Sequence, residues 1–600
     1  MHRIRNALFS REQNIVRFFH GISIRQAAVI GLGVVLFLTV YPRLFPLPSQ
    51  INAHDEASYI HGGYRMFHGD PPALACHPLV SAIFAGAYAL LRASPWWFIQ
   101  SEWLVRAGLF LGLWLCVWRF GRSLRDQIPE WVICLLWLLI PIPNRLLDNP
   151  SQLLFTILLT CALLQCVRFL QDGSRRRLWW ISACLGCAFL TRSEGLWVLL
   201  LACPGMAVVY ILNRRKTPST KIRSALHFLA GWFLPFLCIV MVYVGFYWTI
   251  TGSTDTRLAT RSYEALEAGQ GLSYPERYQG DLHLAGVRDS RSLYGTAAEN
   301  RSSVVNAFLR NPSEMSLRML NNIWAAPQFA GKAYGGLVGI LVALFAVGGV
   351  VHLAMEKQWP LLLLFLSFSL FLIMYVPFFW LSDYFIFLFP VVFFLAAKGI
   401  RSAVEGKSGW LWAVLGVLSA GFLAFGVYAS SLRFVYFGLV ILALWLVHLP
   451  LLREPGHPMP LSAAVATALL LMSNPTYAAS SVLLPDLQTD NLALAAIWLR
   501  ENTSSADTVS GWGATMPYLA ERPFLSLEGY LDSPAVLYSW LITENIGYLY
   551  QDDVVKNLFP DVYQAADSLV AQGCLEAIPE AVWDNGRLLR VVPGCALSSE

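Results

Sequence analysis

Long apolar segments, separated by short polar stretches rich in arginine, recur along most of the chain. Their lengths, roughly 15 to 25 residues, are those that an α-helix needs to cross a lipid bilayer. The pattern therefore predicts about thirteen transmembrane helices. They are expected at about 26–48, 100–119, 128–143, 150–170, 178–191, 195–212, 225–250, 335–354, 360–379, 384–398, 410–428, 434–450 and 460–474.

The apolar segment 78–92, PLVSAIFAGAYALLR, is left out of that count. It is short for a crossing, and a span there would move the arginine clusters that follow it to the other side of the membrane. We predict instead a helix that lies along the outer membrane interface.

The composition agrees with a membrane protein. Of the 600 residues 56% are hydrophobic and 14% are charged, whereas soluble domains carry about 25% charged residues. The predicted fold class is therefore a polytopic α-helical membrane protein, with membrane lipids around it. The basic clusters are explained by membrane topology, and nothing in the sequence indicates a nucleic-acid partner.

Lysine and arginine mark the cytoplasmic side of a membrane protein. The first 25 residues hold five arginines, and the first span lacks a small-residue cleavage site, so we expect a retained anchor. Further basic clusters lie at 119–125, 175–177, 214–223 and 398–407. With all of them inside, we expect a multi-pass protein of the cytoplasmic (inner) membrane, with a cytoplasmic N-terminus and a periplasmic or extracellular C-terminus.

Three regions follow from this topology. They are a cytoplasmic basic N-terminus at 1–25, a transmembrane domain at 26–475 with external loops at 51–99 and 251–334, and an external α/β domain at 476–600. Residues 484–600 hold 16 acidic against 5 basic residues. They contain the helical pattern DNLALAAIWLRENTSS and the strand patterns DTVSGWG and NGRLLRVVP.

Ionisable residues gather at the outer ends of the predicted spans. They are His54, Asp55 and Glu56 in INAHDEASY, Asp148 in PNRLLDNPSQ, and Arg192 and Glu194 in LTRSEGL. Such groups are costly at a membrane boundary and often mark a functional site. Their position on one face favours a reaction between a lipid-borne substrate and a molecule outside the cell, because a transporter more often buries its charges near the midplane.

These motifs, in this order, resemble a known family. DEASY is followed by the turn HGD, by CHPLVSAIFAGAYALL, by LLDNPSQLLFTILLTCALL and by LTRSEGLWVLL. Over residues 26–250 the chain resembles the GT-C superfamily of membrane glycosyltransferases, near glycosyltransferase family 39, which includes protein O-mannosyltransferases and aminoarabinose transferases. The resemblance implies a GT-C-type fold and an inverting transfer of a sugar from a polyprenyl-phosphate donor to an acceptor lipid, glycan or protein.

The resemblance also implies roles for the first external loop. Asp55 matches the family's catalytic carboxylate, and an inverting transfer needs a base for the proton of the attacking hydroxyl. Glu56 is expected to orient the loop or the acceptor; alternatively it is a helix N-terminal charge on the segment that begins at Ala57. Tyr59, the tyrosine of the motif, is a candidate substrate-binding residue.

The donor phosphate is expected near the later motifs. Asp148 matches a second external acid that lies near this phosphate; the alternative is capping of the helix that starts at Pro150. Arg192 is a candidate phosphate ligand with Glu194 beside it, or the two form a structural ion pair. In SDYFIFLFP, Tyr384 keeps the family's phenol, but Asp383 stands where arginine is usual, so another group must neutralise the phosphate.

Histidines flank the first external loop. His77 is a candidate substrate-binding residue. His54 and His77, together with the acidic residues, could also bind zinc or another divalent metal ion. The spacing fits no compact metal motif, and an ordinary polar loop is the alternative. No cofactor is otherwise implied.

The segment 251–330 combines arginine with tyrosine. Its arginines could hold phosphate or an acidic acceptor; the alternative is a solvated loop that folds as a lid. Its tyrosines could stack on sugar rings; the alternative is that they anchor the loop at the membrane interface. These residues are Arg257, Arg261, Arg277, Arg288, Arg291, Arg301, Tyr263, Tyr274, Tyr278 and Tyr294.

Cys574 and Cys595 are expected to form a disulfide, because both lie in the external domain, where disulfides persist. A turn at Asp584-Asn585-Gly586 could bring them together. A free pair, or pairing of either residue with Cys76, is the alternative.

Two other functions stay open. A polysaccharide polymerase or ligase can share the GT-C architecture and would be distinguished by its product. A non-enzymatic transporter of lipid-linked sugars would favour ionisable groups at mid-span and internal repeats, and the sequence indicates neither.

Overall fold

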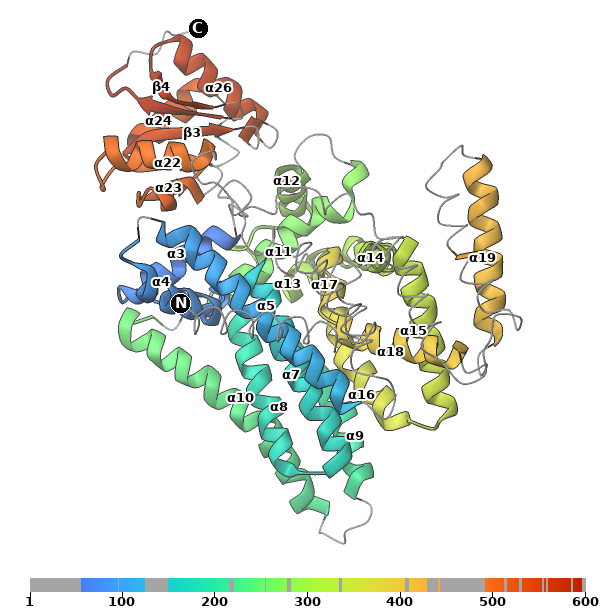
Figure 1. The fold of residues 1–600 in the computed structure, drawn as a ribbon. Helices are drawn as coiled ribbons and strands as arrows, with labels where there is room; N and C mark the ends of the chain where they lie inside the picture. Colours follow the sequence, from blue (N-terminus) through green and yellow to red (C-terminus); the bar gives the residue numbers. More distant parts are fainter. Residues whose placement is uncertain are drawn as a thin grey trace, which may run out of the picture.

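The computed structural model describes residues 55–124, 149–214, 221–428, 441–442 and 491–595, with short gaps inside these ranges. Long helices form one body of the molecule, and a small domain that contains the only sheet of the described residues lies at one end of them (Figure 1). The predictions for four spans (26–48, 128–143, 434–450 apart from 441–442, and 460–474) and for His54, Asp148 and Tyr278 fall outside the described residues.

Five long helices follow the predicted spans closely. They are α5 (Trp97–Ser123), α7 (Pro150–Asp172), α8 (Arg175–Thr191), α9 (Glu194–Arg214) and α10 (Lys221–Thr251). Within the described residues four helical stretches are long and apolar enough to cross a membrane: Trp97–Ser123, Pro150–Asp172, Glu194–Ile211 and Ala225–Thr251. The polytopic helical architecture is therefore present, while the total of thirteen spans stays a prediction.

The later helices are α15 (Leu337–Met355), α16 (Trp359–Ser369), the 3₁₀-helix η5 (Leu370–Tyr375), α17 (Ser382–Ile386), α18 (Phe389–Val404) and α19 (Gly409–Tyr428). Among them α15 and α19 agree with the predicted spans, and the spans predicted at 360–379 and 384–398 differ at prolines. The span predicted at 360–379 stops at Tyr375, because Pro377 disfavours a helical residue before it. The span predicted at 384–398 starts at Phe389 instead, where Pro390 takes a position in the first turn.

Helices α15 and α18 pack backbone against backbone at two glycines. A Cβ atom on Gly349 would lie 1.9 Å from the carbonyl oxygen of Leu395, and one on Gly399 would lie 1.9 Å from that of Phe345. Small residues permit such close approach of membrane helices.

Gly349→Val is therefore expected to force the two helices apart and to destabilise the protein by about 1–3 kcal/mol or more. Thermal unfolding in detergent measures the change. Gly421→Val in α19 is the control, since nothing lies within 4 Å of a Cβ atom there. Equal melting of the two variants would contradict the prediction.

The segment predicted as the first external loop forms two helices, α3 (Asp55–Phe67) and α4 (Pro78–Leu91), with the 3₁₀-helix η2 (Leu74–Cys76) between them. Helix α4 has 14 residues and so spans about 21 Å, less than the roughly 30 Å hydrocarbon core of a bilayer. It packs on α3 and on the start of α5. This is the helix predicted at 78–92, and its place at the membrane interface stays a prediction.

Residues 258–333 fold into a packed helical layer rather than a solvated loop. Its helices are α11 (Leu258–Ser273), α12 (Leu282–Tyr294), α13 (Val304–Arg310) and α14 (Pro312–Ala333), with the 3₁₀-helix η4 (Pro275–Arg277). Tyr263 and Tyr294 are wholly buried in its core. The expectation that these two tyrosines stack on sugars is therefore wrong.

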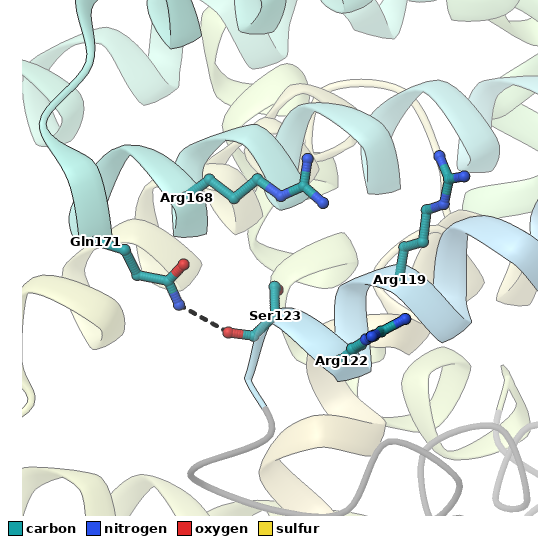
Figure 2. A pocket seen from close by; sticks show the side chains of 5 residues that line it. All are labelled: Arg119, Arg122, Ser123, Arg168 and Gln171. Atoms are coloured by element: carbon teal, nitrogen blue, oxygen red, sulfur yellow. Dashed lines mark hydrogen bonds between the residues drawn. The ribbon is translucent and has the colours of Figure 1, made fainter.

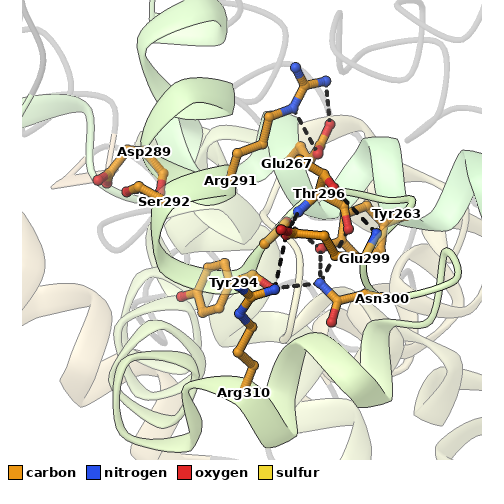
Figure 3. Close-up of polar contacts among 11 residues, drawn as sticks. Tyr263, Glu267, Asp289, Arg291, Ser292, Tyr294, Thr296, Glu299, Asn300 and Arg310 are labelled. Atoms are coloured by element: carbon orange, nitrogen blue, oxygen red, sulfur yellow. Dashed lines mark hydrogen bonds and ion pairs between the residues drawn. The ribbon is translucent and has the colours of Figure 1, made fainter.

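Hydrogen bonds fix the inside of this layer (Figure 3). The Tyr263 hydroxyl donates to the carbonyl oxygen of Gly295 at 2.6 Å, and the Asn300 amide donates to the Tyr263 hydroxyl at 2.7 Å. Several arginines of the segment pair with acidic side chains of the chain itself. These pairs are Arg261–Glu264, Arg277–Glu314, Arg291–Glu267 and Arg310–Glu299.

The tail is a small α/β domain, as predicted. Its sheet has the strand order β2-β1-β3-β5-β4, with β1 parallel to β2 and β3 and the remaining pairs antiparallel. The strands are β1 (Thr508–Gly511), β2 (Phe524–Ser526), β3 (Ile546–Asp552), β4 (Leu575–Trp583) and β5 (Gly586–Val591). The helices are α22 (Asn491–Asn502), α23 (Thr515–Leu519), α24 (Pro534–Thr543) and α26 (Pro560–Ala571).

A disulfide joins Cys574 to Cys595, with their Cα atoms 5.2 Å apart. Cys574 is buried in the apolar core of the domain, beside residues of α24 and α26. The disulfide therefore ties the end of the chain to this core. Cys76, the alternative partner, is a free and exposed cysteine.

The tail rests on the first external loop (Figure 1). The ring of His61 on α3 stacks on that of Tyr518 at a centroid distance of 3.8 Å, and the Trp97 indole donates to the Glu521 carboxylate at 3.0 Å. Apolar residues of α3, α4, α5 and the tail form one continuous buried cluster. The tail is thus an attached part of the molecule.

This docking is expected to weaken in acid. Burial, with a contribution from the charge of Arg65, lowers the pKa of His61 from 6.5 to about 4, although Asp70 opposes the shift. Between these two pH values His61 is protonated when the tail is undocked and neutral when the tail is docked, so protonation favours the undocked state. The stabilisation of the docked tail is therefore complete above about pH 6.5 and is lost as the pH falls toward 4. The loss is at most about 3 kcal/mol.

Hydrogen exchange of α23 at pH 7 and pH 4.5 measures this effect. His61→Phe keeps an aromatic ring without a titrating group and should remove the dependence. His68→Phe, at an exposed histidine of the same loop, should leave it unchanged. Identical protection of the wild-type α23 at both pH values would contradict the prediction.

Candidate active site

Buried polar side chains meet at the turn between α8 and α9. We call Tyr59, His77, Arg192, Glu194, Tyr375 and Tyr384 the Arg192 cluster; all but Tyr375 were candidates from the sequence. Two guanidinium nitrogens of Arg192 donate to the same Glu194 oxygen at 3.0 and 2.7 Å. The Tyr375 hydroxyl donates to that oxygen at 2.6 Å.

The local sequence explains why these charges face each other. Arg192 ends α8 with extended backbone, and Glu194 begins α9, where a negative charge suits the helix dipole. The side chains of Arg192 and Glu194 are only 14% and 5% exposed. A buried carboxylate needs a partner of this kind.

Arg192 keeps capacity to bind an anion. A guanidinium has five N–H donors, and within the described residues three are used, two toward Glu194 and one toward the Ser151 hydroxyl at 3.4 Å. Although burial opposes it, the Glu194 carboxylate raises the pKa of Arg192. The side chain also lies 5.5 Å from the ring of Phe387.

The start of α7 lies against this cluster. The Asn149 side chain accepts hydrogen bonds from the backbone N–H groups of Ser151 and Gln152, with Pro150 in the first turn. This is the cap expected before Pro150, and Asn149 supplies it. Asp148, the candidate acid, lies outside the described residues.

Aromatic rings close one side of the cluster. Tyr375 and Tyr384 are stacked with centroids 3.8 Å apart. Tyr384 lies on the short helix α17 and is buried, and Asp383 beside it is half-buried. Arg192 supplies the guanidinium of this cluster and lies over the ring of Phe387.

Helix α3 approaches the cluster from the first external loop. The rings of Tyr59 and His77 contact edge to face with centroids 5.3 Å apart. His77, in the left-handed conformation at φ 56°, donates from Nδ1 to the carbonyl oxygen of Thr191, next to Arg192. Asp55 and Glu56 begin α3, so the backbone of Asp55 lies one turn before Tyr59.

A second buried pair escaped the sequence analysis. Glu102 and Arg106, in the first half of α5, are almost completely buried and form an ion pair. Within the described residues, Glu102 Oε2 has no hydrogen-bond partner. This pair could have been predicted from the sequence, because an acid and a base four residues apart inside a predicted span indicate a functional group.

No metal site is visible in the part of the chain that the structure describes. There, no group of three His, Cys, Asp or Glu side chains is arranged to hold an ion. The expected divalent ion would involve His54 and Asp148, which lie outside these residues.

The chain is similar in structure to ArnT from Cupriavidus metallidurans bound to undecaprenyl phosphate, with 15% sequence identity and a TM-score of 0.56 over 96% of this chain and 100% of that chain. It is also similar to the oligosaccharyltransferase AglB from Archaeoglobus fulgidus in complex with an inhibitory peptide and a dolichol-phosphate. That match has 11% identity and a TM-score of 0.52 over 94% of this chain and 74% of that chain. The chain has the GT-C fold.

The GT-C fold predicted from the sequence is thus confirmed. No protein-family model matches the chain, and no curated protein matches it by sequence. The closeness to glycosyltransferase family 39 stays a prediction.

Proposed function

We propose that the protein is an inverting glycosyltransferase that takes a sugar from a polyprenyl-phosphate donor and transfers it to an acceptor at the outer membrane face. The observation that carries the proposal is the Arg192 cluster, a buried cation with free donor capacity beside the start of α3, where Asp55 lies. The bound undecaprenyl phosphate of the similar ArnT structure supports a donor of this class.

The proposed chemistry is a single displacement at the anomeric carbon. The acceptor hydroxyl oxygen forms the new bond to this carbon and passes its proton to Asp55. The bond from the carbon to the phosphate oxygen breaks with its electron pair, and polyprenyl phosphate leaves from the opposite face. Arg192 stabilises the negative charge on the leaving phosphate. Tyr384 belongs to the same cluster. Glu194 orients Arg192.

The proposed orientation places the Arg192 cluster outside the cell and the turn between α9 and α10 in the cytoplasm. The basic residues at 175–177 and 214–223 support this. Periplasmic reporter fusions in the loop after α10 should be active, and fusions at 175–177 silent. An active reporter at Arg175 would reverse the orientation and place the cluster in the wrong compartment for an external acceptor.

The decisive experiment supplies purified protein with a polyprenyl-phosphate sugar and measures release of polyprenyl phosphate. Mass spectrometry of envelope glycans from cells with and without the gene then identifies the acceptor. An added single sugar supports the proposal, and an added whole glycan or polymer would indicate a ligase or polymerase on the same fold. Donor that crosses the membrane without bond cleavage would indicate a transporter.

A further inference from the structure

Three arginines surround a cavity at the end of the helix bundle remote from the Arg192 cluster. The cavity has a volume of about 440 Å³ and is lined by Arg119, Arg122 and Ser123 of α5 and Arg168 and Gln171 of α7. In Figure 2, Arg168 extends from α7 beside the end of α5 that carries the other two arginines. The cavity has more than ten times the roughly 30 Å³ volume of a water molecule.

A hydrogen bond joins the two helices that form the cavity, and the lining does not neutralise the positive charge of its three arginines. The Gln171 side chain donates to the backbone carbonyl oxygen of Ser123 at 2.7 Å, which ties α7 to α5. No lining residue is acidic. Asp172, the next residue of α7, accepts from two nitrogens of Arg177 at 3.1 Å. Three like charges around one space repel each other and favour an anion between them.

The surface of α5 continues from the cavity as an apolar stripe. Leu111 and Leu115 are 57% and 44% exposed, and they precede Arg119 by eight and four residues, so all three lie on one helix face. Trp114 and Trp118 stack beside this face with centroids 5.7 Å apart, and tryptophan is typical of the level of lipid headgroups. In a bilayer this arrangement would place the arginines at headgroup depth, with an apolar surface for acyl chains beside them.

We propose that this cavity binds the phosphate group of an anionic membrane lipid, whose acyl chains lie along the exposed leucines of α5. Arginine suits this role because its planar fork holds phosphate oxygens by two parallel hydrogen bonds. Basic pockets between helices at one membrane face are a known way to hold such headgroups. The site is remote from the proposed reaction and does not depend on it.

Lipid titration of the purified full-length protein, followed by native mass spectrometry, tests the proposal. Phosphatidylglycerol should bind to wild type, and phosphatidylcholine, whose phosphate is neutralised by its own ammonium, should not compete. R119Q/R168Q should weaken phosphatidylglycerol binding about 25-fold, at about five-fold per arginine. R119K/R168K keeps both charges and should retain most of the binding.

The matched control is R175Q/R176Q, which removes two exposed arginines at the same end of the bundle outside the cavity. Equal loss in the control and the cavity variant would overturn the proposal, since only general surface charge would then matter. Inorganic phosphate at millimolar concentration should neither bind nor displace lipid; binding of phosphate without lipid would overturn the assignment to a lipid.

Asp126 comes shortly after the cavity residues of α5 in sequence and lies outside the described residues. A further variant, D126N, tests whether its carboxylate occupies the cavity. The expected result is unchanged lipid binding. If wild type fails to bind phosphatidylglycerol and D126N binds it, a carboxylate of the chain fills the cavity and the proposal is wrong.

Discussion

Asp55→Asn is expected to lower the rate of sugar transfer by about 10²- to 10⁴-fold, the usual contribution of a general base. Asparagine keeps the size of the side chain but cannot accept the proton of the attacking hydroxyl. The effect should fall on the rate of the chemical step and leave membrane insertion, abundance and melting temperature unchanged. Release of polyprenyl phosphate under single-turnover conditions measures it.

Asp70→Asn is the matched control for this variant. Asp70 lies in the same external loop, about half exposed, and pairs with Arg65. Its substitution should leave the rate within two-fold, because exposed ion pairs contribute only about 0–1 kcal/mol. Near-normal turnover by Asp55→Asn would remove Asp55 as the base and turn attention to Asp148.

Arg192→Met is expected to abolish transfer and to destabilise the protein by about 3–5 kcal/mol, because it leaves the buried Glu194 carboxylate without its cation. A double variant, R192M/E194Q, removes both charges while its amide oxygen still accepts from the Tyr375 hydroxyl. Replacement of a whole buried pair is often close to neutral. The double variant should therefore regain stability without regaining activity.

This comparison separates the two readings of Arg192. If the residue only forms a structural pair, activity should return with stability in the double variant. If it holds the donor phosphate, activity stays lost. Thermal unfolding in detergent and the release assay measure the two quantities. Arg177→Met is the control, since the Arg177–Asp172 pair is 30% and 41% exposed and its loss should cost about 0–1 kcal/mol.

The helical part of the fold was readable from the sequence because the bilayer imposes a simple rule of length and polarity. The bounds of α5, α7, α9 and α10 fall within a few residues of the predicted spans. The predictions are wrong where a proline sets the end of a helix or where tertiary packing determines the structure of a segment. The helical layer of α11 to α14 looked like a loop, because its core is small and its helices are mostly polar.

The candidate site was partly predictable for a similar reason. Arg192 and Glu194 stand out because polar residues at the end of an apolar segment are visible in sequence, and Tyr59 and His77 were candidates from the loop that carries the family resemblance. Tyr375 gave no signal, since an aromatic residue in an apolar segment is ordinary there, and only the folded chain brings its hydroxyl to Glu194. The contact of the tail with α3 and α5 was likewise invisible, because it joins distant parts of the chain.

Trp97 and Glu521, which hold the tail against α5, are 424 residues apart. At a synthesis rate of about 5–20 residues per second, the ribosome needs about 20–85 s to make the chain between them. Through that interval the surface of α3 and α5 that receives the tail has no partner from its own chain. The nascent protein is therefore expected to need shielding by the insertion machinery or by lipid, and a chain that stops before Tyr518 should be degraded faster than the complete one.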